Sequence, residues 1–108
     1  MYHVSAAIIA ATAMSLLSRP SFSQELGDAN RGQSVAETIC AECHAVEKGA
    51  RRSPNGQAPA FETVAKTRGM TPMALRVWLT SGPHSEMPNI MLQDRDLDDV
   101  IAYVASLK

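Results

Sequence analysis

The feature that most constrains this chain is the run Cys40-Ala41-Glu42-Cys43-His44, in which two residues separate two cysteines and a histidine follows at once. A C-x-x-C-H run is the attachment signature for a c-type haem. The two thiols can form thioether bonds to the two vinyl groups of one porphyrin, and the next residue offers an imidazole to the iron. The run therefore predicts one covalent haem c, anchored by Cys40 and Cys43 and ligated by His44.

Other uses of the two cysteines fit the sequence less well. Structural zinc needs four well-placed ligands. Outside the predicted signal peptide, the nitrogen and sulfur candidates are Cys40, Cys43, His44 and the distant His84. Neighbouring residues such as Cys43 and His44 are awkward corners for one tetrahedron. A thioredoxin-like redox pair needs a βαβ context, and the sequence contains no β-strand pattern. The spacing favours haem over both, and over the disulfide that an exported protein with two cysteines would suggest.

Residues 1–23 are predicted to be a secretory signal peptide. Residues 4–17 form an apolar stretch that is too short to span a bilayer comfortably but suits the central region of such a peptide. Ser21 and Ser23 are small residues where a signal peptidase needs them, which predicts cleavage after Ser23. Residues 1–3 carry no Lys or Arg, so an uncleaved membrane anchor or a misassigned start codon are the alternatives. The expected mature chain, residues 24–108, is one small domain.

Charge and size narrow the functional classes further. The formal net charge is −1, which gives no basic field for binding nucleic acid. A domain as small as residues 24–108 buries only about 60% of the surface that its unfolded chain exposes, so its core is marginal without help. A buried cofactor would make up that deficit.

The stretches on either side of the cysteines predict helices. The first helix begins after Asp28 as N-cap, and small or apolar residues follow the helical period up to Ile39. Gly32 interrupts that pattern, which predicts the close crossing of a second helix; a solvent-facing glycine is the alternative. Residues 45–58 are rich in Gly, Pro, Ser and Asn and predict a loop. A short helix is expected after Pro59.

Two more helices are predicted in the second half of the chain. Thr71-Pro72 opens one of them, with an apolar stripe of Ala74, Val77 and Trp78 beside Leu75 and Leu79, and Gly82-Pro83 ends it. The last helix has the strongest period, with the apolar residues Leu97, Val100, Ile101, Val104 and Leu107. Its early turns carry Asp94, Asp96, Asp98 and Asp99, which we attribute to the positive end of the helix dipole rather than to a metal.

The sixth ligand of the iron decides the chemistry, and Met87 is the predicted residue. It lies in an irregular stretch between Pro83 and Pro88, where the prolines restrict the loop and hold a side chain out towards a ligand. A thioether there raises the reduction potential and closes the iron to exogenous ligands. Met91 is the alternative ligand, and a five-coordinate iron with Met87 as a packing residue is another. His84 is assigned no role.

Taken together, these motifs resemble the class I cytochromes c of the small, soluble bacterial kind. The similarity covers nearly all of residues 27–107 and rests on residues 27–44, the segment Ala58-Pro59-Ala60-Phe61, Trp78-Leu79, the loop at residues 83–89 and the closing helix at residues 97–104. The resemblance implies a compact all-α cytochrome c fold, wrapped around one covalently bound haem. Its first and last helices would cross nearly at right angles.

The resemblance also implies roles for single residues. The carbonyl of Pro59 would accept a hydrogen bond from the ring N–H of the histidine ligand. Trp78 would lie near the haem propionates with its N–H as a donor, or would simply pack in the core. Tyr103 would pack against Gly32 at the helix crossing. Where the family often has an aromatic residue this chain has Ala36, which predicts a thinner crossing.

These observations predict a periplasmic one-electron carrier with His/Met ligation that is not an enzyme. Its expected partners are transient redox proteins, with no membrane span in the mature chain and a monomeric state. Lys48, Arg51 and Arg52 would give the haem edge a positive rim or would be only a solvated loop. Two rival functions stay open at this level: a haem sensor or peroxidase-like protein with an open sixth site, and a cytochrome subunit of a dehydrogenase or oxidase complex.

Overall fold

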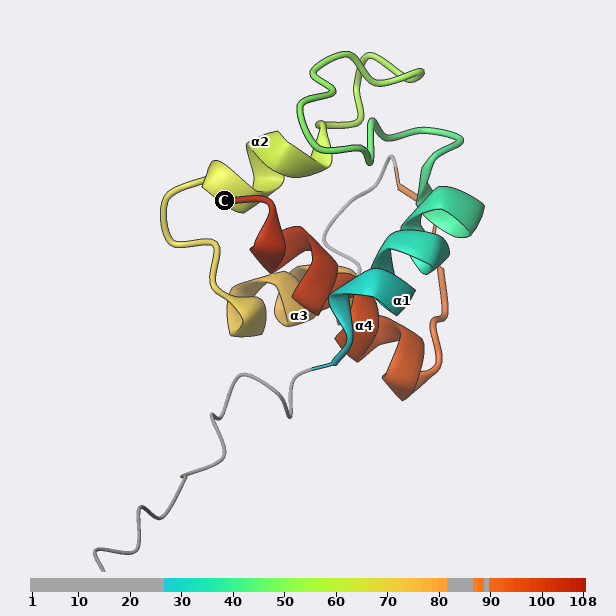
Figure 1. Cartoon of the computed structure of the whole chain (residues 1–108), viewed down its shortest axis with the longest axis vertical. Coiled ribbons are helices and arrows are strands. Elements are labelled where there is room, and N and C mark those ends of the chain that lie inside the picture. The colour runs from blue at the N-terminus through green and yellow to red at the C-terminus, as the bar shows by residue number, and fades with distance from the viewer. Residues whose placement is uncertain (1–26, 82–86, 89) are drawn as a thin grey trace, which may run out of the picture.

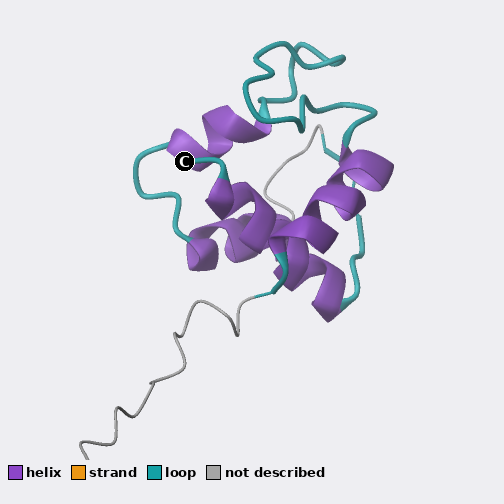
Figure 2. Cartoon of the chain, viewed as in Figure 1, coloured by secondary structure: helices purple, strands orange, loops and turns teal. Residues whose placement is uncertain are grey.

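The computed structural model describes residues 27–81, 87–88 and 90–108, so the predicted signal peptide and His84 lie outside the described residues. The described residues form helices and loops without a strand, which confirms the all-α prediction (Figure 2). Within them, no helix is long and apolar enough to cross a membrane. The helices, in chain order, are α1 (Ala29–Val35), the π-helical turn η2 (Ala36–Cys40), α2 (Phe61–Lys66), α3 (Pro72–Thr80) and α4 (Asp94–Ser106).

The first helix begins as its sequence predicts but ends differently. The Asp28 carboxylate caps α1 by accepting a hydrogen bond from Arg31 N at 2.9 Å. From Ala36 the helix widens into η2, and Ala41 N donates to Ala36 O at 2.9 Å. Single turns of π-helix are rare in proteins, but those that occur often lie at functional sites. Here the wide turn ends at Cys40, the first residue of the C-x-x-C-H run.

The starts of α2 and α3 follow the local signals. α2 begins directly after Ala60, as predicted from the segment after Pro59. Thr71 caps α3 by accepting a hydrogen bond from Ala74 N at 3.1 Å, and Pro72 occupies the first helical position. The structure therefore confirms these helices and the loop between residues 45 and 58.

The stripe predicted for α3 is only partly right. Leu75 is buried and Leu79 packs against the core, whereas Val77 is 51% exposed and Trp78 is 42% exposed. Leu75 and Leu79 are four residues apart, so one face of the helix carries both of them towards α4. The helical period is confirmed, but the face of α3 that packs on the core carries Leu75 and Leu79 rather than Val77 and Trp78.

The last helix is the centre of the fold. α4 contacts α1, α2 and α3, and Figure 1 shows α1 lying across it. The predicted apolar face is buried, as are Ala36 at the start of η2 and Phe61 at the start of α2. The core therefore consists of one long helix covered by three short ones.

α1 and α4 touch through their backbones at Gly32. A Cβ atom added to Gly32 would lie 1.8 Å from the carbonyl oxygen of Asp99 and 2.8 Å from the Cβ atom of Tyr103. Only glycine leaves space for such an approach. The predicted close crossing is thus confirmed, with Tyr103 beside it. Ala36 is fully buried one turn further on, so a small residue closes the contact there.

Asp99 does more than the helix dipole requires. Its side chain is 2% exposed and accepts hydrogen bonds from Asp28 N at 2.7 Å and Arg31 Nε at 3.0 Å. The Arg31 guanidinium and the Asp28 amide hold the pKa of the Asp99 carboxyl below its ordinary value. The sequence interpretation of the acidic run was therefore incomplete, because Asp99 ties the start of α1 to α4.

Candidate functional site

The turn after η2 brings the two thiols and the imidazole of residues 40–44 together in one short segment. The carbonyl of Cys40 accepts hydrogen bonds from Cys43 N at 3.2 Å and His44 N at 2.9 Å. Neither cysteine forms a disulfide, and both are partly buried. Burial raises the pKa of the Cys40 thiol, because it removes the water that would solvate a thiolate. The structure thus presents two thiols outside any disulfide in the same turn as an imidazole.

The His44 ring is fixed by a hydrogen bond to the neighbouring loop. Nδ1 lies 2.7 Å from the carbonyl oxygen of Pro59, which is the contact that the resemblance implied. A carbonyl oxygen can only accept, so the proton is on Nδ1 and the lone pair of the neutral ring is on Nε2. His44 is therefore prepared to donate to a metal through Nε2, with the other nitrogen held as in many histidine ligands of proteins.

Two aromatic rings support the imidazole from the core side. The Phe61 ring lies 5.4 Å from the His44 ring with a tilt of 54°, and 6.5 Å from the Tyr103 ring with a tilt of 52°. Tilted pairs at these separations are favourable because ring edges meet ring faces. Phe61 and Tyr103 are both buried. The position of the imidazole is therefore linked to α4 through a buried aromatic contact.

The backbone that follows the imidazole is tied to the rest of the chain at each residue. Ala45 N donates to Ser53 Oγ at 2.9 Å, and Ala45 O accepts from Phe61 N at 2.9 Å. Val46 O accepts from the Tyr103 hydroxyl at 2.6 Å. The sequence interpretation missed Ser53, because a serine in a predicted turn gives no sign of which amide it will accept from. It also missed the reach of the Tyr103 hydroxyl.

The methionine candidates differ in exposure. Met87 is partly buried, whereas Met91 is 91% exposed and Met73 is 69% exposed. Met70 packs against the core. Residues 82–86 and 89, which flank Met87, lie outside the described residues, so the ligand role of Met87 stays a prediction.

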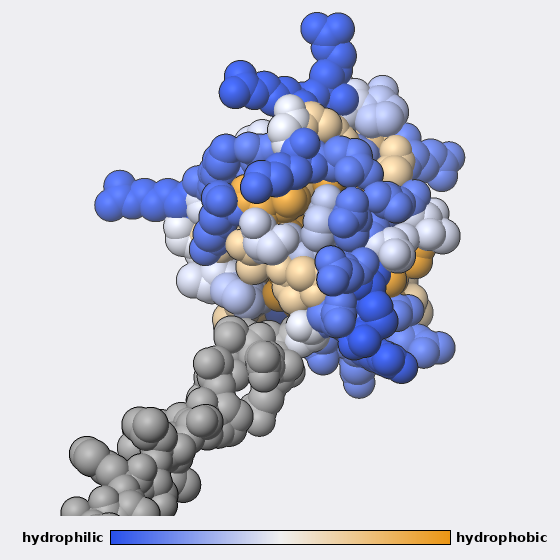
Figure 3. All heavy atoms as spheres, in the orientation of Figure 1, coloured by the Kyte–Doolittle hydropathy of each residue, from blue (hydrophilic) through white to orange (hydrophobic). Residues whose placement is uncertain are grey.

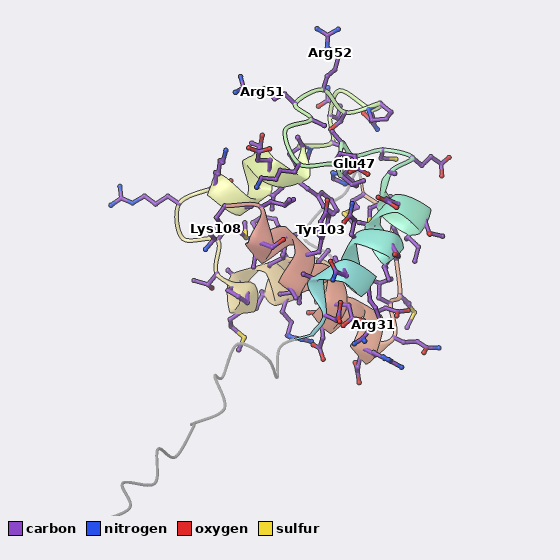
Figure 4. All side chains as sticks on the ribbon, in the orientation of Figure 1. Arg31, Glu47, Arg51, Arg52, Tyr103 and Lys108 are labelled. Atoms are coloured by element: carbon purple, nitrogen blue, oxygen red, sulfur yellow. The ribbon has the colours of Figure 1, made fainter. Side chains whose placement is uncertain are left out.

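The loop at residues 48–56 carries the basic side chains. Arg51 and Arg52 are exposed, and Figure 4 shows them extending from this loop away from the body of the protein. Long hydrophilic side chains project at the same end of the surface in Figure 3. A shallow open hollow lies between residues 51–53 and residues 58–60. The positive charge is therefore accessible to a partner, while its function stays untested.

A haem group fits the residues that this site presents. Two thiols outside any disulfide stand beside an imidazole whose Nε2 carries the lone pair, which is the donor chemistry of a c-type haem. In the part of the chain that the structure describes, the site included, no three His, Cys, Asp or Glu side chains converge as around a bare metal ion. Ile39, next to Cys40, is 37% exposed, as apolar surface beside the anchors of a porphyrin would be in the polypeptide alone.

Comparison with known families gives one match. A family model described as cytochrome C oxidase, cbb3-type, subunit III, matches residues 27–104, which is most of the chain and nearly all of the described helical domain. No curated protein and no solved structure matches the chain significantly. The matched range includes the two cysteines, His44 and the α1–α4 crossing.

Proposed function

The chain belongs to the cytochrome c family represented by this model, and from that premise we propose that it is an exported one-electron carrier with a single covalent haem c. Membership of the family supports a haem c electron carrier or an oxidase-type cytochrome subunit. The observation that carries the proposal further is the His44–Pro59 hydrogen bond, directly after two thiols outside any disulfide. These residues would supply a histidine ligand whose ring is held by the Pro59 carbonyl.

The two thiols would attach the cofactor. Cys40 and Cys43 would hold the haem through thioether bonds to its two vinyl groups. Each attachment would exchange an S–H bond and a C=C π bond for S–C and C–H bonds, so it would need no oxidant or reductant.

The histidine would set the electron density at the metal. When bound, the haem supplies one-electron exchange between Fe(II) and Fe(III). His44 would offer Nε2 to the iron, while its Nδ1–H donates a hydrogen bond to the carbonyl oxygen of Pro59. That hydrogen bond raises the basicity of the ring, which favours the ferric state. Pro59 would thereby tune the potential, and the Phe61 ring packs against the imidazole.

Met87 would complete the coordination, and with both axial positions filled the protein would be a carrier rather than an enzyme. Its partial burial, against the nearly full exposure of Met91, favours it among the methionines of this part of the chain. Trp78 would lie near the propionates. A monomer in the periplasm that meets donor and acceptor proteins briefly fits the small size and the accessible basic loop.

The mass and spectrum of the mature protein test this proposal. We expect a mass that includes one haem and lacks residues 1–23, and a weak far-red band of methionine-to-ferric ligation. Met87→Ala should abolish that band, and the matched control Met91→Ala should keep it. A mass without haem would overturn the proposal, and ready binding of carbon monoxide by the reduced wild type would favour a sensor or peroxidase-like protein with an open site.

A second candidate is a subunit of an oxidase complex, which the description of the matching family favours. The same haem would then hand electrons to a permanent neighbour rather than to a diffusing protein. Gel filtration of a native extract separates the two candidates. A chain that elutes only at high mass would favour the subunit, and elution at the mass of one chain would favour the free carrier.

A further inference from the structure

Apart from the turn bonds to the Cys40 carbonyl, the hydrogen bonds that hold residues 43–46 come from two places in the chain. Four of the groups involved belong to residues 53–61, just downstream: Asn55 N donates to Cys43 O at 3.1 Å, Ser53 accepts from Ala45 N, Pro59 accepts from His44, and Phe61 N donates to Ala45 O at 2.9 Å. One comes from far away in the sequence, because Tyr103 of α4 donates its hydroxyl to Val46 O. Tyr103 is thus the long-range member of this set.

Tyr103 reaches the histidine segment by two routes. Its hydroxyl donates to the carbonyl two residues after His44 at 2.6 Å, and its ring packs on Phe61, whose ring also contacts the imidazole. Tyr103 and Val46 are both almost completely buried. Figure 4 shows Tyr103 between α4 and the loop that carries Glu47. A buried carbonyl must keep its partner, so the phenol cannot be released from this contact without cost.

From this geometry we propose that Tyr103 is a positioning residue for the axial ligand, which fixes the pose of His44 through the Val46 carbonyl and the Phe61 ring. The inference rests on the proposed function for its redox consequence. It goes beyond packing at the helix crossing, because the ring alone would satisfy that role. The hydroxyl transmits the position of α4 to the backbone that aims Nε2.

The consequence concerns the His44–Pro59 hydrogen bond. If the Val46 carbonyl is released, residues 44–46 gain freedom and the Nδ1–H bond to Pro59 weakens. A weaker bond makes the imidazole a poorer donor, which disfavours ferric iron. Loss of the hydroxyl should therefore raise the midpoint potential and speed exchange of the Nδ1 proton.

The test uses the haem-containing full chain and Tyr103→Phe, which removes only the hydroxyl. In the reduced protein we expect the Nδ1 proton of His44 to exchange about tenfold faster by NMR, together with a higher midpoint potential. The matched control Thr67→Val removes an exposed hydroxyl that donates to the Thr63 carbonyl at 2.8 Å, and it should change neither quantity. Unchanged exchange and potential in Tyr103→Phe would overturn the inference.

Two further measurements keep the test decisive. In the wild type, the Tyr103 hydroxyl proton should exchange slowly and show a nuclear Overhauser contact to residue 46; its absence would contradict the inference even if Tyr103→Phe failed to fold. Amide exchange at residues 44–46 detects the tie with or without haem. A wild type that lacks haem would thus refute the proposed function alone, while unaltered amide exchange in Tyr103→Phe would refute the positioning role alone.

Discussion

The α1–α4 crossing and the segment that carries His44 are held by different kinds of contact. At the crossing, two backbones meet at Gly32 and one buried carboxylate, Asp99, ties the helices together. The segment at residues 43–46 is held instead by separate hydrogen bonds to Ser53, Pro59 and Tyr103. The crossing thus depends on the steric fit of two backbones, whereas the segment at residues 43–46 can lose one hydrogen bond and keep the others.

This difference separates folding from tuning. Steric overlap between backbones rises steeply and no small side-chain movement relieves it, so a change at the crossing should affect the stability of the whole domain. Removing one hydrogen bond costs much less and leaves the other ties in place. We therefore expect the crossing to decide whether the chain folds, and the loop to decide where the imidazole points.

The strongest test of the crossing is Gly32→Ala. The new methyl group would overlap the Asp99 carbonyl, so the helices must separate and the free energy of unfolding should fall by about 3 kcal/mol or more. Urea denaturation monitored by circular dichroism measures the loss.

Gly56→Ala is the matched control. A Cβ atom at Gly56 meets nothing within 4 Å. Its stability should therefore stay within about 0.5 kcal/mol of the wild type. Equal losses in the two variants would contradict the steric account of the crossing.

The next largest effect is expected for Asp99→Asn. An amide at this position cannot pair with Arg31 as a carboxylate does, and we expect a loss of about 2 kcal/mol at neutral pH. Because the folded pKa of Asp99 lies below its ordinary value, its contribution is present at neutral pH and is lost as the pH falls through the folded pKa, below about pH 4. The fall in the free energy of unfolding at low pH is the acid limb of the stability profile. Asp99→Asn should flatten this acid limb below about pH 4, because the variant lacks the titrating carboxylate.

Denaturation between pH 2 and pH 7 measures that pH dependence. Asp94→Asn, at an exposed position of the first turn of α4, serves as its control. The control should keep the wild-type acid limb. An unchanged limb in Asp99→Asn would show that the buried carboxylate is not the titrating group.

The smallest effect is expected in the loop, for Ser53→Ala. The amide of Ala45 would lose its acceptor in a buried position, which should cost about 1 kcal/mol and speed exchange at residues 45–46 without unfolding α4. Hydrogen exchange followed by NMR resolves the two regions. Ser34→Ala, which removes an exposed hydroxyl bonded to Asn30 O, should have no such local effect. Faster hydrogen exchange in α4 as well as in residues 45–46 of Ser53→Ala would contradict the independence of the helix crossing from the segment that carries His44.

Local signals predicted the helices well. Asp28 and Thr71 cap the helices that follow them, and Pro72 lies at the first position of α3, because capping depends on residues close in sequence. The apolar face of α4 followed from its period. The wide turn at Ala36–Cys40 could not be predicted in this way, since a 3.6-residue pattern contains no sign of where a helix will take a π turn.

The site was predicted in its chemistry but not in its support. The C-x-x-C-H spacing identified the two thiols and the imidazole. The resemblance predicted the Pro59 carbonyl as the hydrogen-bond acceptor for the ring of His44. The acceptor for Ala45 N and the donor to Val46 O were not predicted, because a hydroxyl can bond in many directions. The partner that a hydroxyl group binds depends on which segments of the chain meet in space.

The sequence by itself determined that this chain is helical and that residues 40–44 offer haem chemistry, because spacing and periodicity are properties of neighbours along the chain. It predicted a close contact at Gly32 but left a solvent-facing glycine as the alternative, which the structure excludes. Only the tertiary structure decided that Asp99 is buried against Arg31 and that Tyr103 reaches the Val46 carbonyl. Both contacts join residues far apart in sequence, and a buried polar group takes its partner from whatever the folded chain brings within hydrogen-bond distance.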